Sequence, residues 1–166
     1  MPVTRERLRG EQEVTIHAPL EVVWDYAMDI TKIPEFHPRV DTVDLISGAA
    51  QRAEGAEYQC NVLEGRGKGS CVEKVVEIVP YQSVVTAIPS DTWGLTKLFD
   101  NYVVDTLVAA IDDSRTRVTI KHYFATRALK SKLIALLAKP KIKRQTADTL
   151  RGLKRAVESR WTSVPR

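Results

Sequence analysis

The sequence lacks any hydrophobic run long enough to cross a membrane. Its longest strongly apolar run extends from Leu133 to Ala138, far short of the ~20 residues that a membrane-spanning helix needs. The first ten residues carry charges but no apolar stretch, so they do not resemble a secretory signal. These absences predict a soluble cytoplasmic protein.

Cysteine and histidine are also scarce. Two cysteines are too few for a disulfide framework. The three histidines, His17, His37 and His122, show no spacing typical of metal ligands. We therefore predict neither a metal site nor a cofactor. With 8 Gly, 8 Pro, 43% apolar and 28% charged residues, the composition excludes a collagen-like or largely disordered chain and favours one globular domain.

Charge is distributed unevenly along the chain. Residues 1–114 contain 10 Lys/Arg and 19 Asp/Glu, whereas residues 115–166 contain 15 Lys/Arg and only two acids. Such asymmetry suggests an anionic partner, for example nucleic acid, a membrane or an acidic protein. The alternative is a basic helix that neutralises an acidic sheet within the same molecule. No nucleic-acid-binding motif is present, so no specific nucleic-acid partner is expected.

The hydrophobic periodicity changes twice along the chain. A strand at 13–17 is followed by two short helices, at about 19–28 and 29–36. Alternating patterns then predict antiparallel strands, and helical spacing returns at the end, where Pro140 kinks or restarts the helix. The predicted strands cover 43–46, 55–64, 69–79, 82–89, 97–111 and 115–127, and the predicted C-terminal helix covers 129–161. This order predicts the α+β class, with one domain at 12–162 preceded by a polar arm at 1–11.

Several segments resemble the START-like helix-grip superfamily, and within it the polyketide cyclase/dehydrase-like branch. They are Val14–Pro19 running into Val22–Asp25, the segment Asp29–Val40, the turn Glu54–Tyr58, and the terminal helix with Leu150, Leu153, Lys154 and Glu158. The resemblance implies a curved antiparallel sheet of about 6–7 strands wrapped around the long helix, with an apolar cavity between them. Members of this superfamily bind lipids, sterols, quinones or polyketides, and some are cyclases or aromatases. The resemblance implies no fixed catalytic residues.

His122 is the candidate catalytic residue. Alternation places it on one strand face with Val118, Ile120 and Phe124, and its ordinary pKa lies near neutrality. The alternative is a core histidine whose ring bonds to a neighbour. Depending on the length of the turn near Asp113, either Asp105 or Val104 lies opposite His122, because a slip of one residue turns each side chain to the other face.

Other residues are candidates for lining the cavity. Tyrosines combine an apolar ring with a polar tip, which suits a pocket that orients an apolar ligand. If Gly65-Arg66 forms the hairpin turn, Cys60 lies opposite Cys71, either as two thiols or as a disulfide. The complete predicted ligand-binding set is Tyr58, Cys60, Val62, Trp93, Phe99, Tyr102, Val104, Ile120, His122, Phe124 and Leu150.

The sequence favours a module that binds or transfers a hydrophobic small molecule in the internal cavity. One alternative is a cyclase, aromatase or dehydratase that uses the same cavity. A second alternative is a protein-interaction or chaperone-type module. The basic run Lys139–Arg144 additionally suggests peripheral contact with an anionic membrane, because each Lys or Arg near such a surface adds about 1 kcal/mol.

Overall fold

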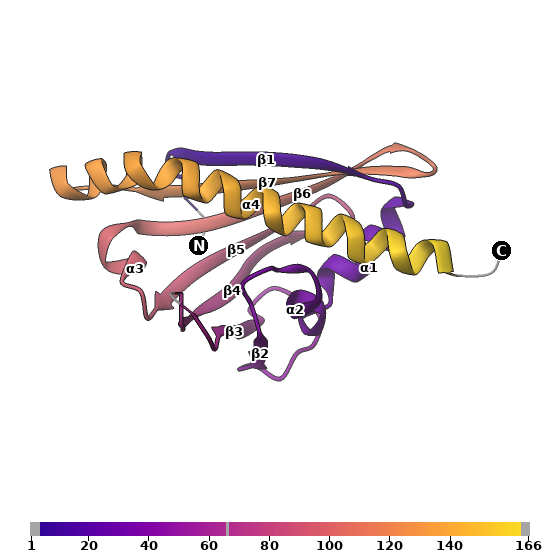
Figure 1. The fold of residues 1–166 in the computed structure, drawn as a ribbon, viewed down its shortest axis with the longest axis horizontal. Coiled ribbons are helices and arrows are strands. Elements are labelled where there is room, and N and C mark those ends of the chain that lie inside the picture. Colours follow the sequence, from indigo (N-terminus) through magenta and orange to yellow (C-terminus); the bar gives the residue numbers. More distant parts are fainter. Residues whose placement is uncertain (1–3, 66, 164–166) are drawn as a thin grey trace.

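The computed structural model describes residues 4–65 and 67–163 as a seven-stranded sheet packed against one long helix (Figure 1). All neighbouring strands are antiparallel, in the order β1-β7-β6-β5-β4-β3-β2. The predicted α+β helix-grip architecture is confirmed. The strands are β1 (Leu8–Ile16), β2 (Thr42–Leu45), β3 (Glu57–Val62), β4 (Gly69–Val79), β5 (Ser83–Asp91), β6 (Asp100–Asp112) and β7 (Arg115–Ala125). The helices are α1 (Leu20–Met28), the 3-10 turn η1 (Ile30–Lys32), α2 (Ile33–Phe36), α3 (Leu95–Leu98) and α4 (Leu129–Ser163).

Local sequence explains the short helices after β1. Pro19 occupies the N-cap of α1, where its missing N–H costs no hydrogen bond. The Asp29 side chain accepts a hydrogen bond from the Thr31 backbone N–H at 3.0 Å and so caps η1. His37, which precedes a proline, is extended and ends α2, as expected for a residue before proline.

Three elements differ from the sequence-based expectation. β1 begins at Leu8, four residues before the expected start of the domain. Residues 95–98 form the short helix α3, so the strand predicted from residue 97 begins at Asp100 instead. α4 continues through Pro140 without interruption, which excludes the alternative that the helix restarts there.

The hairpin of β3 and β4 has the predicted register, with Cys60 opposite Cys71. Both cysteines are free thiols. The turn was predicted at Gly65-Arg66, of which Arg66 lies outside the described residues. The predicted and observed registers agree because the position and length of a tight turn determine which residues pair in a hairpin.

The hairpin of β6 and β7 shows why counting residues outward from the turn left two possible partners for His122, Asp105 and Val104. The turn contains two residues, since Asp112 pairs with Arg115. A bulge between Ala110 and Asp112 then shifts the register by one. Val104 therefore lies opposite His122, and Asp105 lies opposite Lys121.

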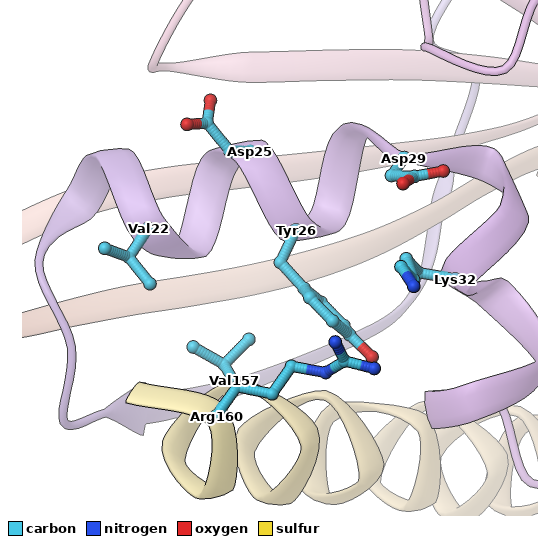
Figure 2. Close-up of a pocket in the computed structure, with 7 residues that line it drawn as sticks. All are labelled: Val22, Asp25, Tyr26, Asp29, Lys32, Val157 and Arg160. Carbon is cyan, nitrogen blue, oxygen red and sulfur yellow. The ribbon is translucent and has the colours of Figure 1, made fainter. Parts of the chain in front are cut away.

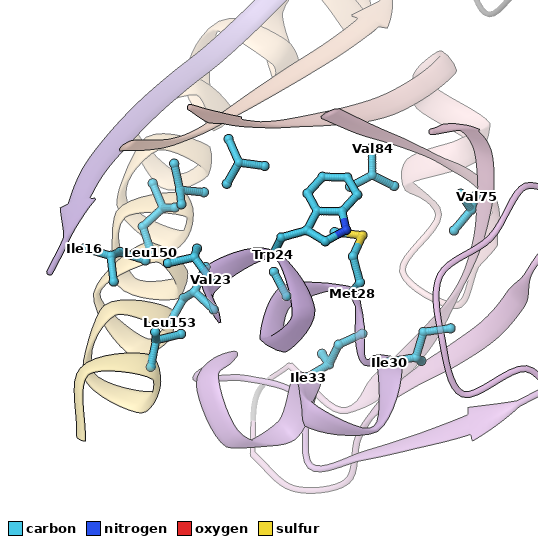
Figure 3. Packing of buried hydrophobic residues seen from close by; sticks show 14 of the residues in the cluster. Ile16, Val23, Trp24, Met28, Ile30, Ile33, Val75, Val84, Leu150 and Leu153 are labelled. Atoms are coloured by element: carbon cyan, nitrogen blue, oxygen red, sulfur yellow. The ribbon is translucent and has the colours of Figure 1, made fainter. Parts of the chain in front are cut away.

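The main hydrophobic core lies between the sheet, α1, α2 and the C-terminal half of α4 (Figure 3). Leu150, Leu153 and Val157 of α4 are almost completely buried, and they recur at the i, i+3, i+4 spacing of an inward helix face. Trp24 of α1 is buried in the same cluster. This half of α4 therefore presents one apolar face to the sheet.

A glycine allows α2 to approach α4 closely. A Cβ atom built on Gly152 would lie 2.0 Å from the Phe36 backbone carbonyl oxygen. Two residues further on, the Lys154 ammonium donates to the Thr15 carbonyl oxygen of β1 at 2.7 Å. The C-terminal half of α4 is therefore held by backbone contacts at both sides.

Candidate functional site

A second, smaller hydrophobic cluster lies against the N-terminal half of α4. We call Phe99, Tyr102 and Phe124 the aromatic cluster. The Phe99 and Phe124 ring centroids are 4.3 Å apart, and those of Tyr102 and Phe124 are 5.0 Å apart. The residue of α4 that is buried against these rings is the small Ala135. Two larger side chains of α4, Ile134 and Ile142, are partly buried and also pack against this cluster.

The His122 ring lies beside the aromatic cluster and is hydrogen-bonded at both nitrogens. The Tyr102 hydroxyl lies 3.1 Å from Nδ1, and the Thr146 hydroxyl of α4 lies 2.9 Å from Nε2. The Thr146 hydroxyl also donates to the Ile142 carbonyl oxygen at 2.7 Å. These groups form one continuous chain from β6 through β7 to α4.

The chain defines the tautomer of His122. A hydroxyl has only one proton to donate, and Thr146 directs it at Ile142. Thr146 therefore accepts from Nε2–H, which leaves Nδ1 to accept the proton of the Tyr102 hydroxyl. Every polar hydrogen in this chain is used, with His122 neutral. One acceptor position on the Tyr102 oxygen remains for an additional donor.

Burial determines the proton affinities of these groups. It lowers the pKa of His122 to about 4, because a buried imidazolium loses its hydration. Burial also raises the pKa of Tyr102, which stays a phenol. An acid-base catalyst at neutral pH works best with a pKa near neutrality, so His122 is poorly matched to that role in this arrangement.

A second polar cluster, around Glu73, lies in the main core. The Tyr58 hydroxyl donates to Glu73 Oε2 at 2.7 Å, and Cys60 Sγ lies 3.8 Å from Glu73 Oε1. Burial raises the pKa of Tyr58. The contact with Cys71, together with burial, raises the pKa of Cys60, which is therefore an unreactive thiol. These contacts satisfy the polar atoms of Tyr58 within the protein.

The structure divides the predicted ligand-binding residues between several places. Phe99, Tyr102, Val104, His122 and Phe124 come together in or beside the smaller cluster. Tyr58, Cys60, Ile120 and Leu150 belong to or pack against the main core, and Val62 is half-buried at the end of β3. Trp93 is 38% exposed, and its indole N–H donates to the Gly67 and Lys68 carbonyls. The residues not predicted for this site are Thr146, Ala135 and Glu73.

A signal for Thr146 was present in the sequence. It interrupts an otherwise apolar stripe of the C-terminal helix, between Ile142 and Leu150. A hydroxyl at an inward helix position needs a hydrogen-bond partner. Its partner, His122, is 24 residues away in the sequence, so only the packing of α4 on the sheet brings the two together.

A hollow of about 390 Å³ opens to solvent between α1, η1 and the C-terminal end of α4 (Figure 2). Two of its polar groups are paired, because the Tyr26 hydroxyl donates to Glu35 at 2.7 Å and Arg160 forms an ion pair with the same carboxylate. A second open hollow, of about 530 Å³, lies between α2 and α4. None of the predicted ligand-binding residues lines either hollow. The internal cavity therefore stays a prediction.

A metal site and a membrane-spanning helix are two further functional possibilities, and neither is found in the part of the chain that the structure describes. Within residues 4–65 and 67–163, no group of three His, Cys, Asp or Glu side chains is arranged to hold a metal ion. Over the same residues, no helix combines the length and apolar character that a bilayer span requires.

Comparison with known families identifies the class of this chain. The model of the family described as "Polyketide cyclase / dehydrase and lipid transport" matches residues 7–158. The chain belongs to this family, and the predicted membership is confirmed. A comparison with curated proteins finds no significant match.

Solved structures with the same fold are distant in sequence. The Zhui aromatase/cyclase of Streptomyces sp. R1128 has a TM-score of 0.71 at 16% identity, covering 92% of this chain and 94% of the other. A START superfamily protein of Mycobacterium smegmatis has a TM-score of 0.63 at 13% identity, covering 90% and 94%. Norcoclaurine synthase of Thalictrum flavum has a TM-score of 0.71 at 12% identity, covering 90% and 93%. These likenesses concern the fold alone.

Proposed function

We propose that this protein binds and transfers a hydrophobic small molecule between the aromatic cluster and the N-terminal half of α4. The observation that carries the proposal is the aromatic cluster itself, which packs against Ala135, Ile134 and Ile142 of α4 and is bordered by the hydrogen-bonded chain through His122, with one acceptor position open on Tyr102. An apolar surface with a single hydrogen-bonding group is typical of a site that orients a mostly apolar ligand. The lipid-transport description of the family agrees with this function.

Access would require the N-terminal half of α4 to move away from the sheet. Before Thr146, the buried side chains of this half are the small Ser131 and Ala135, and Ile134 and Ile142 are only partly buried against the smaller cluster. The C-terminal half has Leu150, Leu153 and Val157 in the main core. Segments with few buried apolar contacts open locally at low cost, so the N-terminal half is the part that would admit a ligand.

The residues argue for binding more strongly than for catalysis. His122 has a pKa of about 4, and neither of its nitrogens is free to reach a substrate. The nearby Tyr102 hydroxyl is a phenol whose pKa burial raises. Its oxygen accepts a hydrogen bond from a ligand hydroxyl without a proton transfer. The ligand class we propose is an apolar molecule with one hydroxyl or similar donor, such as a sterol, a quinol or a polyketide.

A filled-site variant tests the proposal. Ala135→Phe adds a ring on the inward side of α4, whereas Leu136→Phe adds the same ring on the exposed side of the same turn. With an anilinonaphthalene sulfonate dye as fluorescent probe, we expect Ala135→Phe to lower the affinity at least tenfold and Leu136→Phe to leave it unchanged. Circular dichroism checks that both variants fold. Equal dye binding by both variants and the parent protein would overturn this location.

Native mass spectrometry of protein purified from its own source tests the same proposal without substitutions. We expect an apolar adduct at one per chain, which solvent extraction releases for identification. A clean mass of the unliganded chain, together with no measurable dye binding, would refute the proposed function.

A cyclase or dehydratase is the second candidate, because Tyr102 and His122 form a hydrogen-bonded pair beside an apolar surface. The two functions differ in the effect of His122→Ala. A carrier should keep its ligand affinity within a few fold, whereas an acid-base catalyst should lose ~10²–10⁴ in rate. Turnover of the extracted ligand, measured by mass analysis, decides between them.

A further inference from the structure

The N-terminal half of α4 exposes four leucines. Leu129, Leu133, Leu136 and Leu137 are 83%, 58%, 67% and 69% exposed, and we call them the leucine stripe. At 3.6 residues per turn they fall within about 100° of the helix circumference. Isolated exposed leucines are ordinary on protein surfaces, but a contiguous apolar strip on one helix face marks an interaction surface.

The leucine stripe lies opposite the inward side of the helix. The inward side carries Ser131, Ala135 and Thr146, all of which are buried. The leucines therefore do not reach the aromatic cluster from their side of α4. In Figure 1 this half of α4 (orange) lies at the end of the molecule remote from α1 and α2.

Basic side chains flank the leucine stripe on both sides. In a helical projection Lys130 and Lys141 lie on one flank, and Lys132 and Lys139 lie on the other. All four are exposed, as are Lys143 and Arg144 in the next turn. The sequence contains no acid between Asp113 and Asp148.

No direct ion pair with the acidic sheet is seen for these cations among the residues that the structure describes. Within the described ranges, the six basic residues of 130–144 make no ion pair. Only near its C-terminal end does α4 pair with acids or histidines of other elements, through Arg160 with Glu35 and Glu158 with His17. The cations of this half of the helix are therefore available to an anionic partner.

We propose that the N-terminal half of α4 docks on an anionic lipid bilayer, with the leucine stripe inserted between the headgroups and the flanking lysines on their phosphates. An apolar strip with cations along both edges is the arrangement of helices that lie in a membrane interface. A second copy of this chain fits less well, because two-fold pairing would place both uncompensated basic segments against each other. Docking stands on the leucines and lysines alone and does not require that a ligand binds.

Vesicle flotation tests the docking surface. The probes are vesicles of phosphatidylcholine alone and of phosphatidylcholine with phosphatidylserine. The intact protein should bind the anionic vesicles and should bind neutral ones far more weakly. Leu133→Ser/Leu137→Ser should reduce binding to anionic vesicles about a hundredfold, since each inserted leucine side chain contributes about tenfold. Lys130→Gln/Lys139→Gln should reduce it about 25-fold, or about fivefold per charge.

Matched controls remove residues of the same types elsewhere. Leu63→Ser changes a leucine that is 50% exposed near the β3–β4 turn, and Arg155→Gln changes an exposed cation on the C-terminal half of α4. Both should bind anionic vesicles as the parent does. Dye binding in vesicle-free solution should stay unchanged in all variants, so failure of docking and failure of ligand binding are distinguishable.

Two results would overturn the proposal. One is vesicle binding that the leucine and lysine variants do not weaken more than their controls. The other is a parent protein that sediments as a dimer while Leu133→Ser/Leu137→Ser sediments as a monomer, because the leucine stripe would then join two copies of the chain.

Discussion

The two halves of α4 use their apolar residues in opposite ways. The C-terminal half buries Leu150, Leu153 and Val157 and exposes charge, whereas the N-terminal half exposes four leucines and buries Ser131 and Ala135. Both halves belong to one continuous helix. The difference teaches that a single helix can hold the fold with one half and leave the other half available for ligands or surfaces.

Truncating one leucine in each half should give the largest contrast. Leu150 is 1% exposed and Leu137 is 69% exposed. We expect Leu150→Ala to lower the free energy of unfolding by about 3 kcal/mol, the usual cost of a buried cavity. Leu137→Ala should change it by less than about 0.5 kcal/mol. Urea unfolding measures both values, and similar costs for the two variants would contradict the assigned faces.

A methyl group at Gly152 should weaken only the C-terminal half. The Cβ of Gly152→Ala would lie 2.0 Å from the Phe36 carbonyl oxygen, so α2 or α4 must shift. We expect a net loss of about 2 kcal/mol, because overpacking outweighs the gain in helix propensity of about 1 kcal/mol. Thermal unfolding measures the loss. Ser159→Ala, at an exposed position of the same helix, is the control and should be neutral; an equally stable Gly152→Ala would show that the close approach has no cost.

The free energy of unfolding should depend on pH through His122, the residue that joins Thr146 of α4 to the sheet. Folding lowers the pKa of His122 from 6.5 to about 4, so between these pH values the unfolded chain binds a proton that the folded chain does not. The free energy of unfolding therefore rises with pH across this interval, and the histidine causes no loss above pH 6.5. The contribution is about 3 kcal/mol.

The variant His122→Gln isolates this contribution. Urea unfolding at several pH values from about 4 to 7 should show a flatter profile for the variant than for the parent. His37, whose pKa burial also lowers, provides the control, since His37→Gln should remove only its own part of the slope. An identical slope in the parent and His122→Gln would mean that the ring is hydrated in solution.

Amide exchange should resolve the two halves without any substitution. Pro140 lacks an N–H, so the Leu136 carbonyl loses its intrahelical partner, and few side chains anchor residues 129–142. We expect their amides to exchange at least tenfold faster than those of 146–160, which corresponds to about 1.4 kcal/mol. Mass spectrometry of peptides measures the difference. Uniform protection along α4 would remove the argument for local opening.

Some features of the fold follow from local pattern alone. The order of elements was predictable because alternation marks strands and i, i+3, i+4 spacing marks helices. The Cys60–Cys71 register followed from counting outward from a tight turn. Alternation placed His122 on one strand face with Ile120 and Phe124, and Tyr102 was a candidate for lining the cavity. The bond between His122 and Tyr102 required one further fact, the bulge in β6, which hydrophobic pattern does not reveal.

Only the strand residues of the candidate site could be predicted from the sequence pattern. Tyr58 and Cys60 are buried like Tyr102, but they belong to the main core. There their polar atoms contact Glu73. Thr146 and Ala135 come from a helix that follows the strands in the chain. Their place opposite the aromatic cluster depends on how α4 crosses the sheet, which involves contacts between residues far apart in sequence.

The fold class, the element order and the family were predictable from the amino-acid pattern, because periodicity, turn residues and capping act over a few neighbouring positions. Which face of α4 meets the sheet depends on tertiary packing. Helical spacing defines an apolar stripe but not its direction, and close packing against the sheet is what selects the inward side. In this protein Ala135, Ile134 and Ile142 pack against the aromatic cluster, and the leucines between Leu129 and Leu137 are left at the surface.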